Sequence, residues 1–265
     1  VGAILVPEEG IADYAAVCRI LASEIERRGA VLTLNAEVTG LTRAASGWTI
    51  ETAAGDFSTR VLVNCAGLYS DRIATMAGDD PGCMVMPFRG EYHRLKPERE
   101  HLVRHLIYPL PEPGFPFLGV HFTRRVGGGI DAGPNAVLAF AREGYTLGTV
   151  NRGELAEALL YHGLWRFMKA HPEMVTRELR QSFDRVRFVE ALQRLIPEVT
   201  GDDLVSSSSG VRAQAMNSAG ELIHDFVWAE SPGAVHVVNA PSPAATASLV
   251  IGEEISARIS RQLAG

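Results

Sequence analysis

Residues 60–65, which read Arg-Val-Leu-Val-Asn-Cys, form a continuous run of mainly β-branched and apolar residues. Such a run is typical of a strand buried on both faces, which occurs in parallel sheets covered by helices. The next residues, 66–71, contain Gly67 and Ser70 and predict a tight turn from this strand into a helix. We therefore expect an α/β protein with this strand inside its sheet.

The residues before this strand predict a helix followed by an antiparallel insertion. Apolar residues in 14–25 recur every three or four positions, Asp13 is a suitable N-cap and Gly29 a suitable stop, so a helix with one core face is expected. Residues 31–34 predict a strand. Alternating residues at 38–41 and 48–52, separated by turn residues, predict a β-meander inserted into the α/β region.

The character of the sequence changes over residues 84–206, where proline and aromatic residues punctuate short apolar segments. Strands are expected at 89–95, 106–108 and 118–123, and helices at 151–170 and 186–196. Ser206–Ser209 is interpreted as a polar joint, after which a strand at 234–239 and a final helix follow. Two domains are expected. Residues 13–83 and 207–265 are parts of the first. Residues 84–206, together with 1–12, form the second, an α+β domain with a mixed sheet.

Composition excludes several classes of protein. Of 265 residues, 46% are hydrophobic and 21% charged, which is typical of a folded globular chain. The net charge of −6, with no basic cluster, argues against nucleic acid as a partner. Three cysteines without disulfide or zinc spacing favour a reducing compartment, the cytoplasm. No apolar run reaches the roughly 18 to 20 residues of a membrane span, so any membrane contact is expected to be peripheral.

Small residues follow the strand at 234–239 and lead into the last helix. Residues 240–248 read Ala-Pro-Ser-Pro-Ala-Ala-Thr-Ala-Ser, so a large flat group has room to lie against the helix N-terminus. The free N–H groups and the helix dipole favour negative charge at that position. The alternative is that small side chains only permit close helix packing.

Two residues are candidates for chemistry with a carboxylate-bearing substrate. Arg212 lies in Gly-Val-Arg-Ala-Gln and presents a forked donor that matches a carboxylate, although a surface arginine is the simpler alternative. His121 lies in an apolar segment, where it is either a general base or a hydrogen-bonded core residue. No Ser-His-Asp order or His-Glu-x-x-His helix supports a hydrolase or a metalloenzyme.

Residues 127–132 match the dinucleotide-binding pattern G-x-G-x-x-A, but Gly133-Pro134 follows immediately and prevents the helix that must hold a pyrophosphate. We reject this segment as a nucleotide loop. It is either a plain hairpin turn or a glycine-rich bend near a ligand.

Several segments, spread over nearly the whole chain, together resemble one family. The two longest and most specific are residues 115–123, Phe-Pro-Phe-Leu-Gly-Val-His-Phe-Thr, and 239–248. Shorter matching segments are 64–67, 88–92, 133–136, 142–145 and 210–214. This set resembles the D-amino-acid-oxidase-like FAD-dependent oxidoreductases and, within them, the L-2-hydroxyglutarate dehydrogenase/oxidase family.

The resemblance implies a discontinuous, Rossmann-like FAD-binding domain around a substrate domain whose sheet covers the flavin. Val38 is then expected to meet the adenine through its backbone, and Ala66 and Gly67 to flank the pyrophosphate. Six further residues are expected to lie beneath the isoalloxazine: Ala240, Pro241, Ser242, Pro243, Ala244 and Ala245. Gly210 is also expected to bind the cofactor.

The resemblance also implies oxidation of a small 2-hydroxy acid, with L-2-hydroxyglutarate converted to 2-oxoglutarate as the leading reaction. Arg212 is expected to hold the substrate carboxylate, and His121 to take the hydroxyl proton as hydride leaves for flavin N5. Tyr92 and Arg89 are expected to help bind the substrate. An amine or glycerol-phosphate oxidoreductase of the same superfamily is the alternative, as is a non-catalytic, truncated substrate-binding fragment. The electron acceptor, quinone or oxygen, is left open.

This chain departs from the family in one respect. The strand, G-x-G-x-x-G turn and helix that open such proteins do not occur in it. A truncated chain or partial gene product is therefore expected, with poor FAD binding and no turnover. We also expect an unpaired sheet edge and exposed apolar surface, which favour self-association, so a homo-oligomer is possible.

Overall fold

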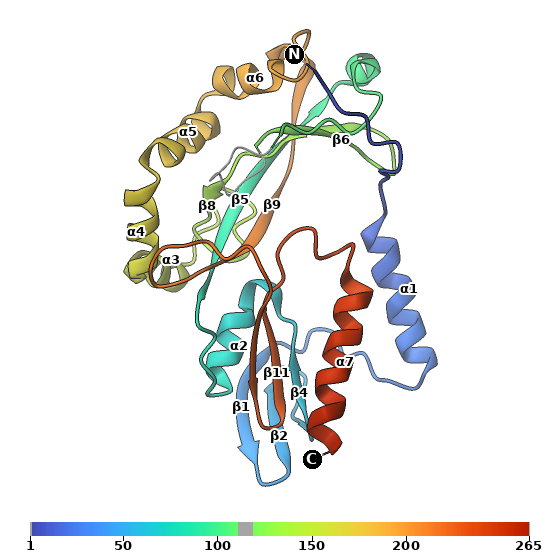
Figure 1. The fold of residues 1–265 in the computed structure, drawn as a ribbon, viewed down its shortest axis with the longest axis vertical. Helices are drawn as coiled ribbons and strands as arrows, with labels where there is room; N and C mark the ends of the chain where they lie inside the picture. Colours follow the sequence, from blue (N-terminus) through green and yellow to red (C-terminus); the bar gives the residue numbers. More distant parts are fainter. Residues whose placement is uncertain (1, 111–118, 265) are drawn as a thin grey trace.

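The computed structural model describes residues 2–110 and 119–264. Its elements form two groups, one above the other in Figure 1. The lower group contains two three-stranded sheets and the helices α1, α2 and α7, and the upper group contains a five-stranded sheet with helices α3 to α6.

The lower α/β sheet has the strand order β10 (Val227–Ser231), β11 (Ala234–Asn239), β4 (Leu62–Asn64). Strands β4 and β11 are parallel, with Leu62 opposite Ala234, which confirms the α/β expectation. The 3-10 turn η1 (Gly67–Tyr69) and helix α2 (Ser70–Met76) follow β4, as predicted. The prediction that this strand is buried on both faces was wrong, because Val63 is 37% exposed. Strand β4 ends the sheet, so one of its edges has no strand partner among the described residues.

The predicted meander is present as the second sheet. It consists of β1 (Val38–Ala44), β2 (Gly47–Thr52) and β3 (Phe57–Thr59), all antiparallel. Trp48 fastens it to the α/β sheet by packing on Leu62 and Ala234 and by donating from Nε1 to the carbonyl of Gly233 at 2.7 Å. The turn into β2 uses Gly47 at φ 148°, where a Cβ would lie 2.1 Å from the carbonyl oxygen of Thr59.

The upper sheet is built on two long antiparallel strands, β5 (Met84–Leu95) and β9 (Leu204–Met216). The shorter strands are β6 (His121–Arg124), β7 (Ile130–Gly133) and β8 (Val137–Leu138). Ser206–Ser209 was predicted to be an irregular joint, which is wrong, because these residues continue β9 beside β5. Residues 125–129 form the turn between β6 and β7, as the hairpin interpretation predicted.

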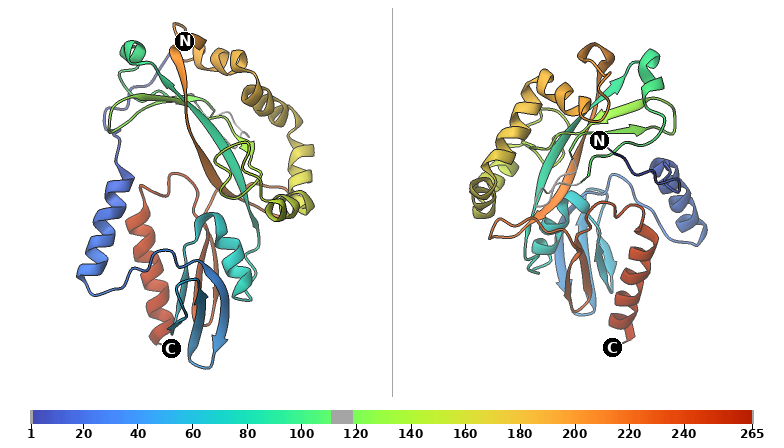
Figure 2. Two further views of the ribbon diagram at one scale, coloured as in Figure 1. Left: turned by 180° about the vertical axis from the view of Figure 1, so that it is seen from behind. Right: turned by 45° about the horizontal axis from the view of Figure 1, so that its top comes forward.

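Four helices run in succession along one side of the upper sheet (Figures 1 and 2). They are α3 (Arg152–Leu160), α4 (His162–Ala170), α5 (Pro172–Phe183) and α6 (Arg185–Gln193). The upper group also contains the 3-10 turns η2 (Pro97–Leu102) and η3 (Gly201–Asp203). The prediction of a single helix over 151–170 was wrong. The chain breaks at Tyr161, whose hydroxyl donates to the carbonyl of Met216 at 2.9 Å. Helix α5 was not predicted.

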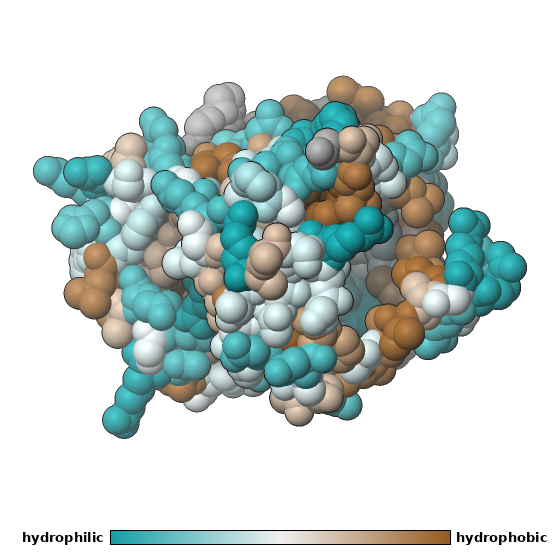
Figure 3. All heavy atoms as spheres, turned by 90° about the horizontal axis from the view of Figure 1, so that it is seen from below, coloured by the Kyte–Doolittle hydropathy of each residue, from teal (hydrophilic) through white to brown (hydrophobic). Residues whose placement is uncertain are grey.

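Helices α1 (Tyr14–Arg27) and α7 (Ser248–Ala264) have no buried residue in the described structure. Asp13 caps α1 by accepting from the amide of Ala16, as predicted, but the expected core face of the helix is exposed to solvent. The segment 31–34 is exposed and is not a strand, because no neighbouring strand supplies hydrogen bonds. Seen from below, hydrophobic residues gather toward the α1 side and border a hollow there (Figure 3). None of the helices in the described ranges combines the length and apolar character needed to span a bilayer.

We expect this chain, prepared by itself, to self-associate through these exposed apolar faces. Ile20 and Ile25 on α1 are 69% and 47% exposed. Sedimentation velocity over a range of concentrations should show oligomers, and the pair of changes Ile20→Glu and Ile25→Glu should reduce them. Ser23→Glu adds a charge to the same helix without removing an apolar side chain and serves as the control. A monomer at every concentration would contradict the expectation.

Candidate functional site

Tyr92, His121 and Arg212 come from three different strands of the upper sheet, β5, β6 and β9, and Arg212 is near enough to act electrostatically on the other two. The charge of Arg212 acts on the Tyr92 hydroxyl and also on the His121 ring. Burial raises the pKa of Tyr92 above its ordinary value, while the Arg212 charge opposes that rise. The tyrosine is therefore a neutral hydroxyl beside a guanidinium.

Strand register explains how Tyr92 reaches Arg212. Along β5 and β9, Gly90 lies opposite Gly210, and the register shifts between Glu91 and His93. The Tyr92 ring lies beside Gly210, with Cε2 3.9 Å from the position that a Gly210 Cβ would occupy. A Cβ at residue 210 would therefore be in ordinary van der Waals contact with the ring.

His121 is held in the protonation state of a base. Its side chain is 8% exposed, and its Nδ1 lies 3.0 Å from the carbonyl oxygen of Gly119. A carbonyl only accepts, so Nδ1 carries the proton and the neutral ring has its acceptor lone pair on Nε2. Burial lowers the pKa of His121, and the Arg212 charge lowers it further, although the bond to Gly119 acts in the opposite direction. The Tyr108 ring covers the imidazole at a centroid distance of 4.6 Å.

Arg89, the fourth predicted catalytic residue, has a different environment. It is 4% exposed, and its Nη2 donates to Glu91 Oε1 at 2.7 Å. Asn135 and Ser182 also bind Glu91, so the cluster is polar and buried. Arg89 and Tyr92 both line a cavity of about 790 Å³ bordered by Ser206–Ser209. Among the described residues, Arg89 thus pairs with Glu91 and makes no side-chain hydrogen bond or ion pair with His121 or Arg212.

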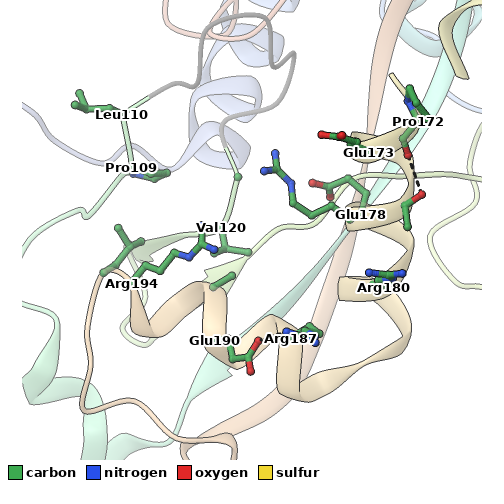
Figure 4. Close-up of a pocket in the computed structure, with 15 residues that line it drawn as sticks. Pro109, Leu110, Val120, Pro172, Glu173, Glu178, Arg180, Arg187, Glu190 and Arg194 are labelled. Atoms are coloured by element: carbon green, nitrogen blue, oxygen red, sulfur yellow. Dashed lines mark hydrogen bonds and ion pairs between the residues drawn. The ribbon is translucent and has the colours of Figure 1, made fainter. Parts of the chain in front are cut away.

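A second cavity, of about 620 Å³, lies between α5, α6 and the chain around Pro109 and Val120 (Figure 4). Charged side chains of both signs line it, and Arg187 and Glu190 form an ion pair at 3.0 Å. Glu178 on its wall is 6% exposed and accepts from the Ala136 amide at 2.7 Å. Burial raises the pKa of Glu178, while the charges of Arg177 and Arg212 oppose the rise. Glu178 was not among the candidate residues, because it stands in helix α5, which was not predicted.

The segment of small residues, 240–247, connects β11 to α7. Figure 1 shows it rising from the end of β11 toward β9 before the chain descends into α7, and both views of Figure 2 agree. Its backbone forms consecutive turns, with the Ala244 amide bound to the Pro241 carbonyl and the Thr246 amide to the Pro243 carbonyl. These residues lead from the strand into the last helix, as expected, and α7 begins at Ser248.

The remaining predicted cofactor-binding residues lie in the lower group. Ala66 and Gly67 form the exposed turn between β4 and α2, and Val38 is the half-buried first residue of β1. Gly67 has φ 57°, and no atom lies within 4 Å of the position that a Cβ would take. Ser242, Pro243 and Ala245 are also exposed. An open glycine turn and a segment of small exposed residues leave room for a large planar cofactor, so the residues fit such a group.

Comparisons with known proteins agree with this architecture. Residues 1–258 match the family model DAO, described as FAD dependent oxidoreductase. The chain therefore belongs to the DAO family of FAD-dependent oxidoreductases, as the resemblance predicted, and FAD is the cofactor of that family.

Several similar curated proteins are L-2-hydroxyglutarate dehydrogenases by name. "L-2-hydroxyglutarate dehydrogenase" of Indibacter alkaliphilus is 47% identical over 95% of this chain and 63% of its own length. The Escherichia coli K12 protein of that name is 40% identical over 99% of this chain and 63% of its own length. A Caenorhabditis elegans protein, "L-2-hydroxyglutarate dehydrogenase, mitochondrial", is 43% identical over 94% of this chain and 60% of its own length. The chain thus spans about three fifths of the curated relatives it matches.

Solved structures show the same fold at low sequence identity. L-alpha-glycerophosphate oxidase from Mycoplasma pneumoniae with FAD bound has a TM-score of 0.62 and 18% identity, covering 89% of this chain and 53% of that chain. Glycerol-3-phosphate dehydrogenase from Bacillus halodurans complexed with FAD has a TM-score of 0.57 and 13% identity, covering 93% of this chain and 43% of that chain.

Proposed function

We propose that this chain functions in the FAD-dependent oxidation of L-2-hydroxyglutarate to 2-oxoglutarate. The observation that supports it most is the cluster of Tyr92, His121 and Arg212, because it combines a carboxylate-binding guanidinium with a neutral base. The shared name of relatives at 40–47% identity supports the choice of substrate.

The three side chains have separate roles in this proposal. The Arg212 guanidinium binds the carboxylate next to the hydroxyl-bearing carbon, and the Tyr92 hydroxyl orients that guanidinium. His121 Nε2 accepts the proton of the substrate hydroxyl, so a C=O bond forms as the C–H bond breaks. FAD, when bound, supplies the two-electron acceptor for the hydride that leaves this carbon.

Other residues of the chain are proposed to hold the cofactor. Ala66 and Gly67 border the pyrophosphate, the exposed segment 240–245 lies against the flavin ring, and Gly210 lies beside that ring. Val38 meets the adenine. Within this proposal residues 84–206, with 1–12, form the substrate domain, and 13–83 and 207–265 form the FAD domain. A role for Arg89 in substrate binding is retained only as a prediction, because its partner is Glu91.

A panel of substrates tests this function in the protein expressed from its complete gene. Turnover should be fastest with L-2-hydroxyglutarate, and glycerol 3-phosphate and L-amino acids should be poor substrates. Preference for one of the latter would overturn the substrate and favour the alternative within the family. Binding of L-2-hydroxyglutarate without flavin or turnover would favour a binding role.

The pH dependence of kcat/KM should report His121 as the base. Its pKa lies below the ordinary value of about 6.5, so the ring is neutral at pH 7 and gains a proton only in more acidic solution. We expect kcat/KM to fall as the pH decreases through a value below 6.5 and to be flat from there to neutral pH. His121→Asn should remove this acid limb. A limb centred above pH 7 would contradict the assignment.

A reducing compartment such as the cytoplasm is also proposed. All three cysteines are free; Cys18 and Cys65 are exposed, and Cys83 is buried. Contact with a quinone or a membrane surface, and a homo-oligomeric state, stay predictions.

A further inference from the structure

A buried polar cluster lies beneath the turn formed by residues 65–67, outside the substrate site. His236 on β11 is fully buried and Asn64 on β4 is 3% exposed. His236 Nε2 lies 3.0 Å from Asp79 Oδ2, and His236 Nδ1 lies 3.0 Å from Asn64 Nδ2. Asp79 also accepts from the Ser231 hydroxyl at 2.7 Å. A polar cluster this deep is costly unless every member has a partner.

The partners determine where the imidazole proton lies. The side-chain amide nitrogen of Asn64 is only a donor, so His236 Nδ1 must accept from it. The proton of the neutral ring is then on Nε2 and is donated to the Asp79 carboxylate. Asn64 uses its second amide hydrogen to bind the Ser70 carbonyl at 2.8 Å. Both amide hydrogens of Asn64 are thereby engaged, which fixes the direction of its Oδ1.

That oxygen holds the turn. Asn64 Oδ1 accepts from the Ala66 amide at 3.0 Å, and the single hydroxyl hydrogen of Ser70 is shared between the carbonyls of Gly67 and Val238, which lie 2.8 and 2.7 Å from Oγ. If Asn64 rotated by half a turn about its last side-chain bond, its amide group would face the Ala66 amide, and donor would meet donor. His236 prevents this rotation because its Nδ1 accepts only from the amide nitrogen.

We propose that His236 is a positioning residue for the cofactor, acting through Asn64 on the turn at Ala66 and Gly67. Asp79 keeps the His236 ring in the required tautomer, and the ring in turn fixes the orientation of the Asn64 side-chain amide. Asn64 then holds the conformation of the turn beside which the FAD pyrophosphate is proposed to lie. This inference rests on the proposed function. The turn matters because Gly67 has φ 57° with open space beside it, so a small change in backbone conformation alters how closely a phosphate approaches.

Two substitutions at His236 test its contacts with Asp79 and with Asn64 separately. Asn places its side-chain oxygen near the position of His Nδ1, so His236→Asn keeps the contact with Asn64 and loses that with Asp79. Gln reaches the position of Nε2, so His236→Gln keeps Asp79 and loses Asn64. The control is His224→Ala, because His224 is exposed.

The dissociation constant of FAD is measured for the protein expressed from its complete gene, by flavin fluorescence, together with the thermal midpoint. His236→Gln should weaken FAD binding by about tenfold, the size of one buried hydrogen bond, whereas His236→Asn should weaken it clearly less. The control should bind as the unmodified protein does. Equal FAD affinity for all variants despite lowered thermal midpoints would show a structural role only and overturn the proposal.

Two measurements on the unmodified protein do not depend on variants that fail to fold. Nitrogen-15 NMR of the His236 ring should show a proton on Nε2 and none on Nδ1, and the Ala66 amide should be protected from hydrogen exchange. The opposite tautomer, or a rapidly exchanging Ala66 amide, would overturn the positioning scheme. If both NMR results hold but the protein binds no FAD, the proposed function fails while the internal arrangement stands.

Discussion

Replacing Arg212 by alanine is expected to lower kcat/KM for L-2-hydroxyglutarate by roughly a thousandfold. The guanidinium binds the substrate carboxylate in the proposed site, and its charge also acts on Tyr92. Removing one partner of a buried, hydrogen-bonded charge pair costs about 2–5 kcal/mol, and each 1.36 kcal/mol is about tenfold in rate. Steady-state kinetics with an artificial electron acceptor measure the loss.

Arg212→Lys distinguishes two ways of binding the carboxylate: paired hydrogen bonds from the guanidinium, or attraction by a positive charge alone. Lysine keeps the charge but loses the paired donors, so we expect most of the loss to persist. Arg261→Ala, which removes an exposed arginine of α7, is the control and should leave kcat/KM unchanged. A decrease of less than about fivefold for Arg212→Ala would show that the carboxylate is held elsewhere.

Asp71→Ala is expected to lower the free energy of unfolding by about 3–5 kcal/mol, because it leaves the Arg142 charge buried without its partner. The two side chains are 7% and 3% exposed, and Arg142 Nη1 and Nη2 lie 2.6 and 2.9 Å from the two carboxylate oxygens. Asp71 also accepts from the Val85 amide at 2.9 Å, and Arg142 donates to the Leu68 carbonyl. The pair thus connects helix α2 and turn η1 to β5 and to the segment before α3.

Urea unfolding monitored by circular dichroism measures this change. The matched control is Arg187→Ala, which breaks a pair whose side chains are 60% and 52% exposed and should cost less than about 1 kcal/mol. Replacing both partners, as in Asp71→Leu with Arg142→Met, should recover much of the loss, because no unpaired charge is then buried. A similar small effect for Asp71→Ala and Arg187→Ala would contradict the account.

Local sequence patterns predicted the elements whose structure depends on near neighbours. The meander follows from the glycines and polar residues at its turns, and the strand, turn and helix around Gly67 follow from a compact apolar run. The family resemblance named Arg212, His121 and Tyr92, and the structure brings them together. The nearness of Tyr92 to Arg212 could not be read from the sequence, because it depends on the register shift in β5 between Glu91 and His93.

The remaining expectations failed where long-range contacts decide the structure. The helical pattern over 151–170 is continuous, but the Tyr161 hydroxyl binds a carbonyl 55 residues away and the helix breaks there. Ser206–Ser209 resembles a loop in composition, yet it belongs to β9, with Ser206 opposite His93 and Ser209 opposite Glu91 on β5. Apolar residues of α1 predicted a core face, but no other described element covers them.

Anaerobic titration of the flavin-loaded protein, expressed from its complete gene, with L-2-hydroxyglutarate tests the central claim most directly. We predict that the oxidised-flavin absorbance band disappears as substrate is added and that one 2-oxoglutarate forms for each flavin reduced. A flavin that dithionite reduces but that L-2-hydroxyglutarate leaves oxidised would contradict the claim.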